Sequence, residues 1–580
     1  MSVAAYDQTV RADIQEFAAQ IEKFLTGEIN DDDFRAVRLR RGIYGQRQTG
    51  VQMVRTKIPG GIMTAEQMDV LAEVATNYAG GKSHITTRQN VQFHFVPLRG
   101  VPALLSRLAD VRLTTREACY NTVRNVTASP LAGLMDDEVF DIGPYVRSTA
   151  LALLHKELTD SLPRKFKICF FAGGAKDDVV SSMNDVGLTA KIVDGQKGFR
   201  VVIGAGLGPL PMEAQLLDEF LPVERVVNRI EAVIRVFNTH GNRKNKNKAR
   251  LKFVIRERGF AWVKDAIEKE YADILANGGI ATPTEIPEGF GGFRQHAPAL
   301  GDGNLLPVLG PTFADPGFDR WLETNVSEQK QSGYSVVTIR VEQGNLTDGQ
   351  MHGLAKIARD AGDGLIRVSV DQNLMIGFIP VFNLKRAYAA LQALDLAKAG
   401  AGEIEDVTTC PGAYSCNLAL TKSMNLGAAL SETVSRYTDP AVRKLSIKIS
   451  GCPNSCGQHW LADFGLFGNS KKIDGKEVPY YQMMLGGGFD KEGVLRYAFT
   501  TQSIPARLAP IAVRRVLDHY LLDRRKTESF REYVMRNKVE FFRGLTYDLV
   551  KPAELTPEMF QDWGDNVAYS LQLGKGECAA

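Results

Sequence analysis

Four cysteines stand in two pairs in the C-terminal third of the chain. Cys410 and Cys416 are separated by five residues in TTCPGAYSCNLAL, and Cys452 and Cys456 by three residues in GCPNSC. Structural zinc sites usually take cysteine pairs two to four residues apart, so the first pair is unusual for zinc. A [4Fe–4S] cubane accepts wider and mixed spacings, because thiolates approach its four irons from different directions. The spacing favours such a cluster, with zinc and inert buried thiols as the alternatives.

The other cysteines, Cys119, Cys169 and Cys578, are isolated, and we expect them to be buried small hydrophobic side chains or surface thiols. The N-terminus lacks a basic segment followed by an apolar one, and no stretch approaches ~18 uninterrupted apolar residues. We therefore expect a cytoplasmic protein with no membrane partner. In a reducing compartment, clustered cysteines more often bind metal than form disulfides.

Composition sets the class of protein broadly. At 580 residues the chain should divide into several domains, and its 44% hydrophobic and 24% charged residues are ordinary for a soluble globular protein. The formal net charge is only +3. Nothing in the overall charge indicates binding to nucleic acid or to an anionic membrane.

An internal repeat is the most informative pattern in the chain. IPGGIMTAEQMDVLAEVA (58–75) and VEQGNLTDGQMHGLAKIA (341–358) share Gly, Thr, Gln-Met, Leu-Ala and a final Ala in one register, 283 residues apart. The same offset, without a gap, aligns TRQNVQFHFVP (87–97) with VDQNLMIGFIP (370–380). The sequence therefore predicts two copies of one unit, joined by the Gly/Pro-rich stretches GGIATPTEIPEGFGGF and GPTFADPGF.

Each copy should contain a helix followed by a strand. Thr64 with Gln67, and Thr347 with Gln350, have the spacing of a capping box that opens a helix. HITTRQNVQFHF reads as one strand with an apolar face and a polar face. The apolar face would hold Ile85, Val91, Phe93 and Phe95, and the polar face Arg88, Asn90, Gln92 and His94. The N-terminal segment 13–25 has helical apolar spacing and should pack on the outside.

The two copies differ in charge on this polar face. At the offset of 283, Arg88 becomes Asp371 and His94 becomes Gly377, while the apolar positions are kept. A looser alignment carries Arg124 to Val407, near Cys410, and PRKFKIC to the segment LSIKISGC that contains Cys452. Equivalent places are thus expected to hold cations in the first half and cysteines in the second.

Taken together, these motifs resemble the siroheme-dependent nitrite and sulfite reductases. The resemblance rests on the C-x5-C pair, GCPNSC, TTRQN, RNV, LPRKFK and the two-fold repeat, and it extends from about residue 45 to the C-terminus. It implies a [4Fe–4S] cluster held by Cys410, Cys416, Cys452 and Cys456. It also implies that Cys456 is shared with the iron of a siroheme.

The resemblance further implies four catalytic cations: Arg88, Arg124, Lys165 and Lys167. A six-electron reduction of sulfite or nitrite needs positive groups that hold the anion, neutralise charge and supply protons. Arginine suits the clamping of an oxyanion, and lysine releases a proton more readily when it is desolvated beside other cations. Without the resemblance, each would be read as a surface charge or an ordinary ion pair.

Position 167 bears on the choice of substrate. Plant-type nitrite reductases resemble this pattern but have Asn where Lys167 stands, whereas sulfite reductases have Lys. Sulfite carries more negative charge than nitrite near neutral pH, so an extra cation favours it. We therefore expect sulfite reduction to sulfide, with assimilatory nitrite reduction to ammonia as the alternative.

A second basic run, HGNRKNKNKARLKF, lacks the interleaved aromatic residues of a nucleic-acid site. The family uses a similar segment near the eight carboxylates of siroheme, which makes Arg243, Lys246, Lys248 and Arg250 candidates for carboxylate binding. The chain contains no flavin or NADPH motif, so we expect electrons from a separate ferredoxin or flavoprotein subunit. Two rival classes remain. A DNA-processing protein with a structural [4Fe–4S] cluster would need helicase or nuclease motifs, which the sequence lacks. A zinc-stabilised scaffold would leave the Arg/Lys asymmetry unexplained.

The expected fold is α+β, a pseudo-two-fold repeat of ferredoxin-like half-domains and siroheme- and Fe–S-binding α/β domains. The expected division is an N-terminal helical extension (1–45), a first ferredoxin-like half-domain (46–115), a first siroheme-binding domain (116–295), a linker (296–329), a second ferredoxin-like half-domain (330–400) and a [4Fe–4S]/siroheme domain (401–580).

Overall fold

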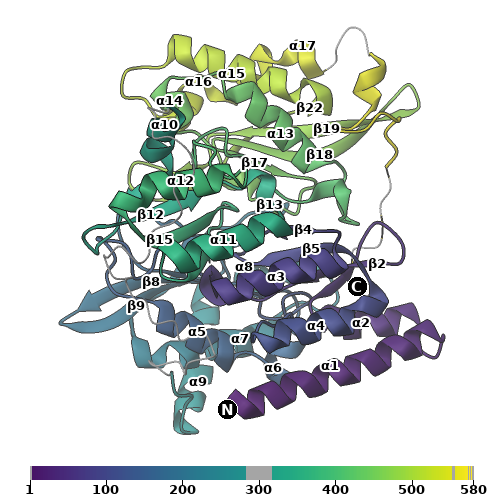
Figure 1. Ribbon diagram of the computed structural model, residues 1–580, viewed down its shortest axis with the longest axis vertical. Coiled ribbons are helices and arrows are strands. Elements are labelled where there is room, and N and C mark those ends of the chain that lie inside the picture. The colour runs from purple at the N-terminus through teal and green to yellow at the C-terminus, as the bar shows by residue number, and fades with distance from the viewer. Residues whose placement is uncertain (1–2, 283–315, 551–555, 572–573, 575–576, 578–580) are drawn as a thin grey trace.

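The structure is a computed structural model that describes the chain apart from residues 1–2, 283–315, 551–555, 572–573, 575–576 and 578–580. Within the described residues, four five-stranded sheets and one two-stranded ribbon combine with helices (Figure 1). The fold is therefore α+β, as the sequence predicts.

Two of the sheets are antiparallel and exchange a strand with each other. Across the first sheet run β1 (Ile43–Gly45), β2 (Val51–Arg55), β5 (Val91–Pro97), β4 (Lys82–Ile85) and β13 (Asn345–Thr347). Across the second run β11 (Val326–Glu328), β12 (Tyr334–Ile339), β15 (Leu374–Pro380), β14 (Leu365–Val368) and β3 (Ile62–Thr64). Strand β3 pairs with β14 and strand β13 with β4, so each half of the chain completes the sheet of the other.

The predicted repeat is confirmed in register. Helices α3 (Ala65–Tyr78) and α11 (Asp348–Ala361) lie 283 residues apart, open with the two predicted capping boxes and pack side by side at the centre of the molecule (Figure 1). His352 Nδ1 lies 2.8 Å from Asp69 Oδ1, and these two residues hold the same place in the two copies. The two halves therefore meet around a pseudo-two-fold axis between these helices.

The single strand predicted for HITTRQNVQFHF is wrong, because the segment forms a hairpin. Strand β4 ends at Ile85 and the antiparallel β5 begins at Val91, with these two residues opposite each other. In the turn, the Gln89 N–H donates to the Thr86 carbonyl (3.0 Å), and Gln89 has a positive φ of 54°. The Thr86 hydroxyl accepts from the Arg88 N–H at 3.1 Å, a local bond that competes with a continuous strand. Arg88 thus lies in a turn and not on a strand face.

The other two sheets also match each other. The third consists of β10 (Gln215–Pro222), β9 (Gln196–Ile203), β8 (Val186–Val193), β7 (Ile168–Phe171) and β6 (Thr127–Ala128). The fourth consists of β16 (Thr408–Thr409), β17 (Ile447–Ser450), β18 (Phe464–Ile473), β19 (Lys476–Leu485) and β22 (Phe499–Pro505). In both sheets the first three strands in chain order are parallel and the remaining pairings are antiparallel. The ribbon pairs β20 (Gly488–Phe489) with β21 (Leu495–Arg496).

Helices cover these sheets and form the cores with them. Besides α3 and α11, they are α1 (Val3–Leu25), α2 (Asp31–Arg40), α4 (Val101–Asp110), α5 (Gly143–Ala152), α6 (Glu157–Asp160), α7 (Val226–His240), α8 (Leu251–Arg258), α9 (Phe260–Ala276), α10 (Pro316–Asn325), α12 (Leu384–Gln392), α13 (Ser423–Val434), α14 (Pro440–Arg443), α15 (Ala509–Asp523), α16 (Phe530–Leu545) and α17 (Tyr547–Val550). One hydrophobic core lies under both strand-exchanged sheets, and separate cores lie within 123–274 and 404–549. Helix α1 packs on the outer side of the shared core through Ile14, Phe17 and Ile21.

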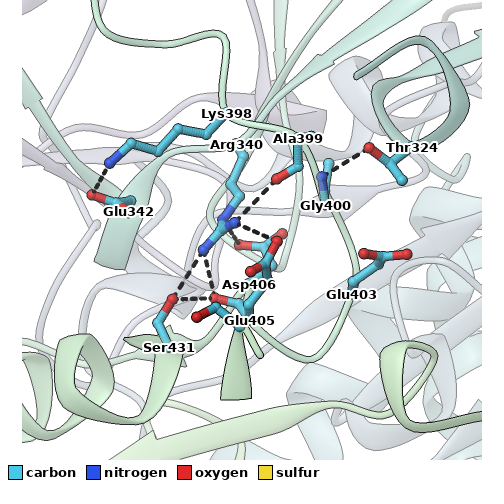
Figure 2. A network of polar contacts seen from close by, with 12 residues as sticks. Thr324, Arg340, Glu342, Lys398, Ala399, Gly400, Glu403, Glu405, Asp406 and Ser431 are labelled. Carbon is cyan, nitrogen blue, oxygen red and sulfur yellow. Dashed lines mark hydrogen bonds and ion pairs between the residues drawn. The ribbon is translucent and has the colours of Figure 1, made fainter. Parts of the chain in front are cut away.

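A buried arginine ties the second strand-exchanged sheet to the fourth sheet (Figure 2). Arg340, just after β12, donates to the backbone oxygens of Ala399 (3.1 Å) and Glu405 (2.7 Å) and to the Ser431 hydroxyl on α13 (3.0 Å). Its first-half counterpart, 283 residues earlier, is Lys57, which donates to the Val123 carbonyl at 3.2 Å. Both halves thus use a buried cation to fix the orientation of their two sheets.

The predictions of a linker between the halves and of no membrane span can be compared with the described residues. The linker expected at 296–329 falls mostly on residues outside the described part, and its described remainder forms α10 and β11. Across the described helices, none combines the length and apolar character needed to span a bilayer.

Candidate functional site

The four paired cysteines come together in the second half. Cys410 follows β16, Cys416 follows one turn later, and the Cys452–Cys456 loop follows β17. Because β16 and β17 are parallel neighbours, their C-terminal ends bring both loops to one edge of the sheet. The Gly451 N–H donates to Cys410 Sγ at 3.2 Å, which joins the two pairs directly.

The electrostatics of the thiols also reflect this grouping. Burial raises the pKa of Cys416 to about 12 and raises the pKa of Cys452 further, with the neighbouring cysteines adding to both shifts. Burial and then Cys456 raise the pKa of Cys410, while the Ser423 hydroxyl and the Gly451 N–H oppose this shift. Three neighbouring thiols with raised pKa values, those of Cys410, Cys416 and Cys452, form a site that needs a positive partner to become thiolate.

In the first half, Arg88 projects from the β4–β5 turn into a buried polar site. Its guanidinium donates to Asn184 Oδ1 (2.8 Å), to the Asn125 carbonyl (2.7 Å) and, at 3.4 Å, to the Ile168 carbonyl. Burial lowers the pKa of Arg88 to about 10, and Arg124 and Arg250 contribute to the decrease. Arg88 therefore keeps its charge at neutral pH although it is desolvated.

Lys167 stands immediately before β7 in the same site. Burial, and after it Arg88, Arg250 and Lys165, lower the pKa of Lys167 well below its usual value, whereas Asp185 opposes the decrease. Asp185 is fully buried, accepts from the Lys167 N–H at 2.9 Å and forms an ion pair with Arg250 at 2.8 Å. An ammonium group placed among cations in this way gives up its proton easily, as a general acid must.

Arg124 is the remaining predicted cation. It is 8% exposed and donates to the carbonyls of Ala118 (3.2 Å) and Tyr120 (2.9 Å) and, at 3.3 Å, to the Tyr44 hydroxyl. Its effect on the pKa of Arg88 shows that the two guanidinium groups lie near each other. The structure thus brings together all four cations named from the sequence.

The basic run at 243–250 divides into two parts. The first part precedes α8 and contains Arg243 and, in a short 3-10 helix, Lys246 and Lys248. Arg243 donates to Asn238 Oδ1 at 2.6 Å, and burial lowers the pKa of Lys246. Arg250 instead points inward to Asp185. Lys252, two residues on and absent from the sequence prediction, is buried against the carbonyls of Gly206 and Leu207, and burial lowers its pKa to about 8.

A hydrogen bond joins the cation site to the cysteine site. The hydroxyl of Thr87, next to Arg88, donates to the Cys456 carbonyl at 2.8 Å. Among the described residues, Arg88 Nε, Ser455 Oγ and Gln458 Nε2 are buried without a hydrogen-bond partner. Unsatisfied polar atoms on both sides of this junction fit a bound polar group between the two sites.

Two expectations about cysteine positions need comment. Strands β7 and β17 are equivalent, but the cations stand before β7 whereas Cys452 and Cys456 follow β17, so the alignment of cations with cysteines is wrong in detail. The two sets of residues occupy opposite ends of equivalent strands.

Cys119 and Cys169 are fully buried, as expected, and Cys578 lies outside the described residues. Within the described ranges, no group of three or more His, Cys, Asp or Glu side chains is arranged to hold a single metal ion.

Comparison with known families identifies the class of protein. The model for the nitrite and sulphite reductase 4Fe-4S domain matches residues 119–275 and 400–550. The model for the nitrite/sulfite reductase ferredoxin-like half domain matches 44–116 and 327–394. These ranges cover more than half of the chain, which is therefore an iron–sulfur oxidoreductase. More particularly, it belongs to the nitrite and sulfite reductase family, whose members use siroheme and a [4Fe–4S] cluster.

Individual relatives cover nearly the whole chain. A ferredoxin–nitrite reductase from Synechococcus elongatus is 31% identical over 493 residues, 83% of this chain and 88% of its own. A sulfite reductase [ferredoxin] 1 from Mycolicibacterium paratuberculosis is 26% identical over 89% of this chain and 90% of its own. The structure of the Mycobacterium tuberculosis NirA protein superimposes with a TM-score of 0.74 at 27% identity, covering 89% of this chain and 92% of that one.

Proposed function

We propose that this protein reduces sulfite to sulfide by six electrons, with nitrite reduction to ammonia as the second candidate. The choice of sulfite rests on Lys167, because its amine lies beside Arg88 and Arg250, where a bound anion of higher charge favours the protonated form of the lysine. The ferredoxin–nitrite reductase from Synechococcus elongatus, 31% identical, supports the second candidate. The proposal includes the six-part domain division given above, for which the ranges of the two family models are the support.

The proposed ligands of the [4Fe–4S] cluster are Cys410, Cys416, Cys452 and Cys456, with Cys456 shared with siroheme. When bound, these groups supply the iron that takes the anion and the electrons that reduce it. The residues proposed to face siroheme carboxylates are Arg243, Lys246, Lys248 and Arg250. Of these, Arg250 is mainly structural, because it forms a bidentate ion pair with Asp185. Lys252 is a further candidate cation.

The protein's own residues have separate tasks. Arg88 and Arg124 hold the anion, since their charges persist in a desolvated site where charge–charge attraction is strong. Lys165 and Lys167 supply protons for the loss of water, and Lys167 is suited to this because its neighbours lower its pKa. Electrons would come from a separate protein, for which the ferredoxin named in both relatives is the leading candidate.

The test of substrate is the ratio of kcat/KM for sulfite and nitrite. It is measured on the siroheme-loaded protein with electrochemically reduced methyl viologen, because dithionite itself releases sulfite. The wild-type protein should prefer sulfite, and Lys167→Asn should shift the ratio toward nitrite by roughly tenfold or more, as expected for losing one charge contact. A wild-type preference for nitrite would favour the second candidate, and an unchanged ratio in the variant would remove Lys167 as the discriminating residue.

The ligand assignment has its own test. Cys456→Ser should lose the electronic coupling between haem and cluster in the optical and electron paramagnetic spectra, because the shared sulfur is gone. Cys169→Ser is the control for the loss of a thiol, since Cys169 is also free but belongs to a small apolar cluster that contains none of the paired cysteines. It should keep the coupling. Normal coupling and activity in Cys456→Ser would contradict the bridging assignment.

A further inference from the structure

Two adjacent buried residues organise the cation site. Asn184 and Asp185 stand just before β8 and are both fully buried. Asn184 Oδ1 accepts from Arg88 Nη1 at 2.8 Å, while its Nδ2 donates to the carbonyls of Val180 (3.2 Å) and Ser181 (3.1 Å). Asp185 accepts from Arg250 and from the Lys167 N–H. One dipeptide thus contacts three basic residues that come from distant parts of the chain.

Asp185 and Asn184 differ in their effect on the arginine that each one binds. Asp185 neutralises Arg250 through a two-pronged ion pair. In contrast, the guanidinium of Arg88 bonds, within the described part of the chain, only to an amide oxygen and to backbone carbonyls, all of which are neutral. An amide fixes the direction of the guanidinium as a carboxylate would, but it leaves the positive charge available to an anion.

The second half of the molecule provides an internal comparison. Asp463, just before β18, accepts from the Ser446 N–H at 2.9 Å, as Asp185 accepts from the Lys167 N–H at 2.9 Å. The acid is therefore present in both copies and serves the local backbone. The residue before it is Ala462 in the second copy, where Asp371 replaces Arg88. The amide occurs in the copy that has the arginine and is replaced by a methyl group in the copy that lacks it.

We propose that Asn184 is a positioning residue that aims Arg88 at the substrate anion while leaving the charge of Arg88 unpaired. This inference rests on the proposed role of Arg88 in binding the anion. Both polar atoms of the Asn184 side chain are already bonded to Arg88 and to backbone carbonyls, so its effect is assigned to the guanidinium. Its identity as an amide is the requirement, because an acid of the same shape would pair with Arg88.

The experiment measures anion binding without turnover. Oxidised, siroheme-loaded protein is titrated with sulfite and with nitrite, and the change in the haem absorption gives Kd. Asn184→Ala should weaken binding roughly tenfold to a hundredfold, the usual effect of losing a hydrogen bond to a charged group. Asn184→Asp should weaken it more, because the new carboxylate pairs with Arg88. Asn184→Ser is the second variant if Asn184→Ala does not take up siroheme.

Asn325→Asp is the matched control for folding. Asn325 is also buried, and its Nδ2 likewise donates to two backbone carbonyls, those of Thr338 (2.9 Å) and Lys398 (3.0 Å), far along the chain from the cation site. It should show a similar loss of stability and an unchanged Kd. If Asn325→Asp weakens anion binding as much as Asn184→Asp does, the proposal is wrong.

A double-mutant cycle separates positioning from general damage. In Arg88→Ala, the further change Asn184→Ala should have almost no effect on Kd, because its only route to the anion is gone. Additive effects would show that Asn184 does not act through Arg88. They would overturn this inference but leave the proposed anion role of Arg88 standing. If Arg88→Ala leaves Kd unchanged, the proposed anion role of Arg88 fails and the inference fails with it.

Discussion

At the scale of single residues, the buried side chain of His459 should lower the free energy of unfolding. It follows Cys456 by three positions, is fully buried, and both of its ring nitrogens lack a hydrogen-bond partner among the described residues. Its ring packs at 4.8 Å from the ring of Phe467. Burial lowers the pKa of His459 from 6.5 to about 3, so the folded protein holds it neutral.

This predicts a pH-dependent effect of His459→Phe. At neutral pH the variant should be more stable by roughly 1–3 kcal/mol, because it removes two unsatisfied buried nitrogens. Below pH 6.5 only the unfolded wild type takes up the proton, so the histidine costs more stability as the pH falls toward 3. Denaturant unfolding of both proteins between pH 7.5 and 5 measures the difference. A difference that stays constant with pH would contradict this account.

The sequence indicated some site residues and missed others. The cysteine spacing favoured a cluster without any alignment, whereas the roles of Lys165 and Lys167 came only from the resemblance to a family. Asn184 and Asp185 were missed because an Asn-Asp pair is a common turn sequence with no local mark of function. A structural alignment of β8 with β18, which sets Asn184 against Ala462, is the signal that finds them.

At the scale of elements, two glutamines hold the repeat together. Gln89 Nε2 donates to the carbonyls of Ala128 and Val368, both at 2.8 Å, and its counterpart Gln372 donates to the Ile85 carbonyl at 2.8 Å. Both glutamines have positive φ, and both are nearly fully buried. Each therefore links a hairpin turn of one half to a strand of the other half.

Gln89→Ala should lower the free energy of unfolding by roughly 2–3 kcal/mol, because two buried carbonyls lose their donor. Gln372→Ala should have a comparable effect. Gln215→Ala, on the exposed face of β10, is the control and should change stability by no more than about 0.5 kcal/mol. Denaturant titrations give all three values, and a loss below about 1 kcal/mol for both buried glutamines would refute the linking role.

Elements with strong local signals were predictable. The capping boxes and the repeat register are confirmed, because Thr64, Gln67 and their counterparts satisfy backbone groups within one helical turn. The hairpin was missed because the apolar residues Ile85, Val91 and Phe93, which flank the all-polar TTRQN, fall in one alternating register, whereas the Thr86 hydroxyl stabilises a turn. The exchange of β3 and β13 leaves no trace in the sequence, since each strand has only three residues and pairs with a partner far along the chain.

At the scale of the whole molecule, the strand exchange predicts that neither half folds alone. A fragment of residues 1–282 lacks β13 and the second half of the shared core, and a fragment of 316–580 lacks β3. In each fragment produced separately, the strand-exchanged sheet should show no cooperative unfolding transition, whatever the separate cores at 123–274 and 404–549 do, whereas the two fragments produced together should assemble. Calorimetry and size-exclusion chromatography measure this. A cooperative transition of the shared-core residues in the isolated first fragment would show that the exchange is dispensable.

The exchange of β3 and β13 also delays the folding of the first half while the chain is being synthesised on the ribosome. Strand β3 leaves the exit tunnel early, but its partner β14 follows only after the roughly 300 residues between them, which take about 15–60 s to translate. During this interval the nascent chain exposes apolar surface that the shared core later covers. We therefore expect a chaperone to bind the emerging first half. The metal groups should be delivered only after the chain is released from the ribosome.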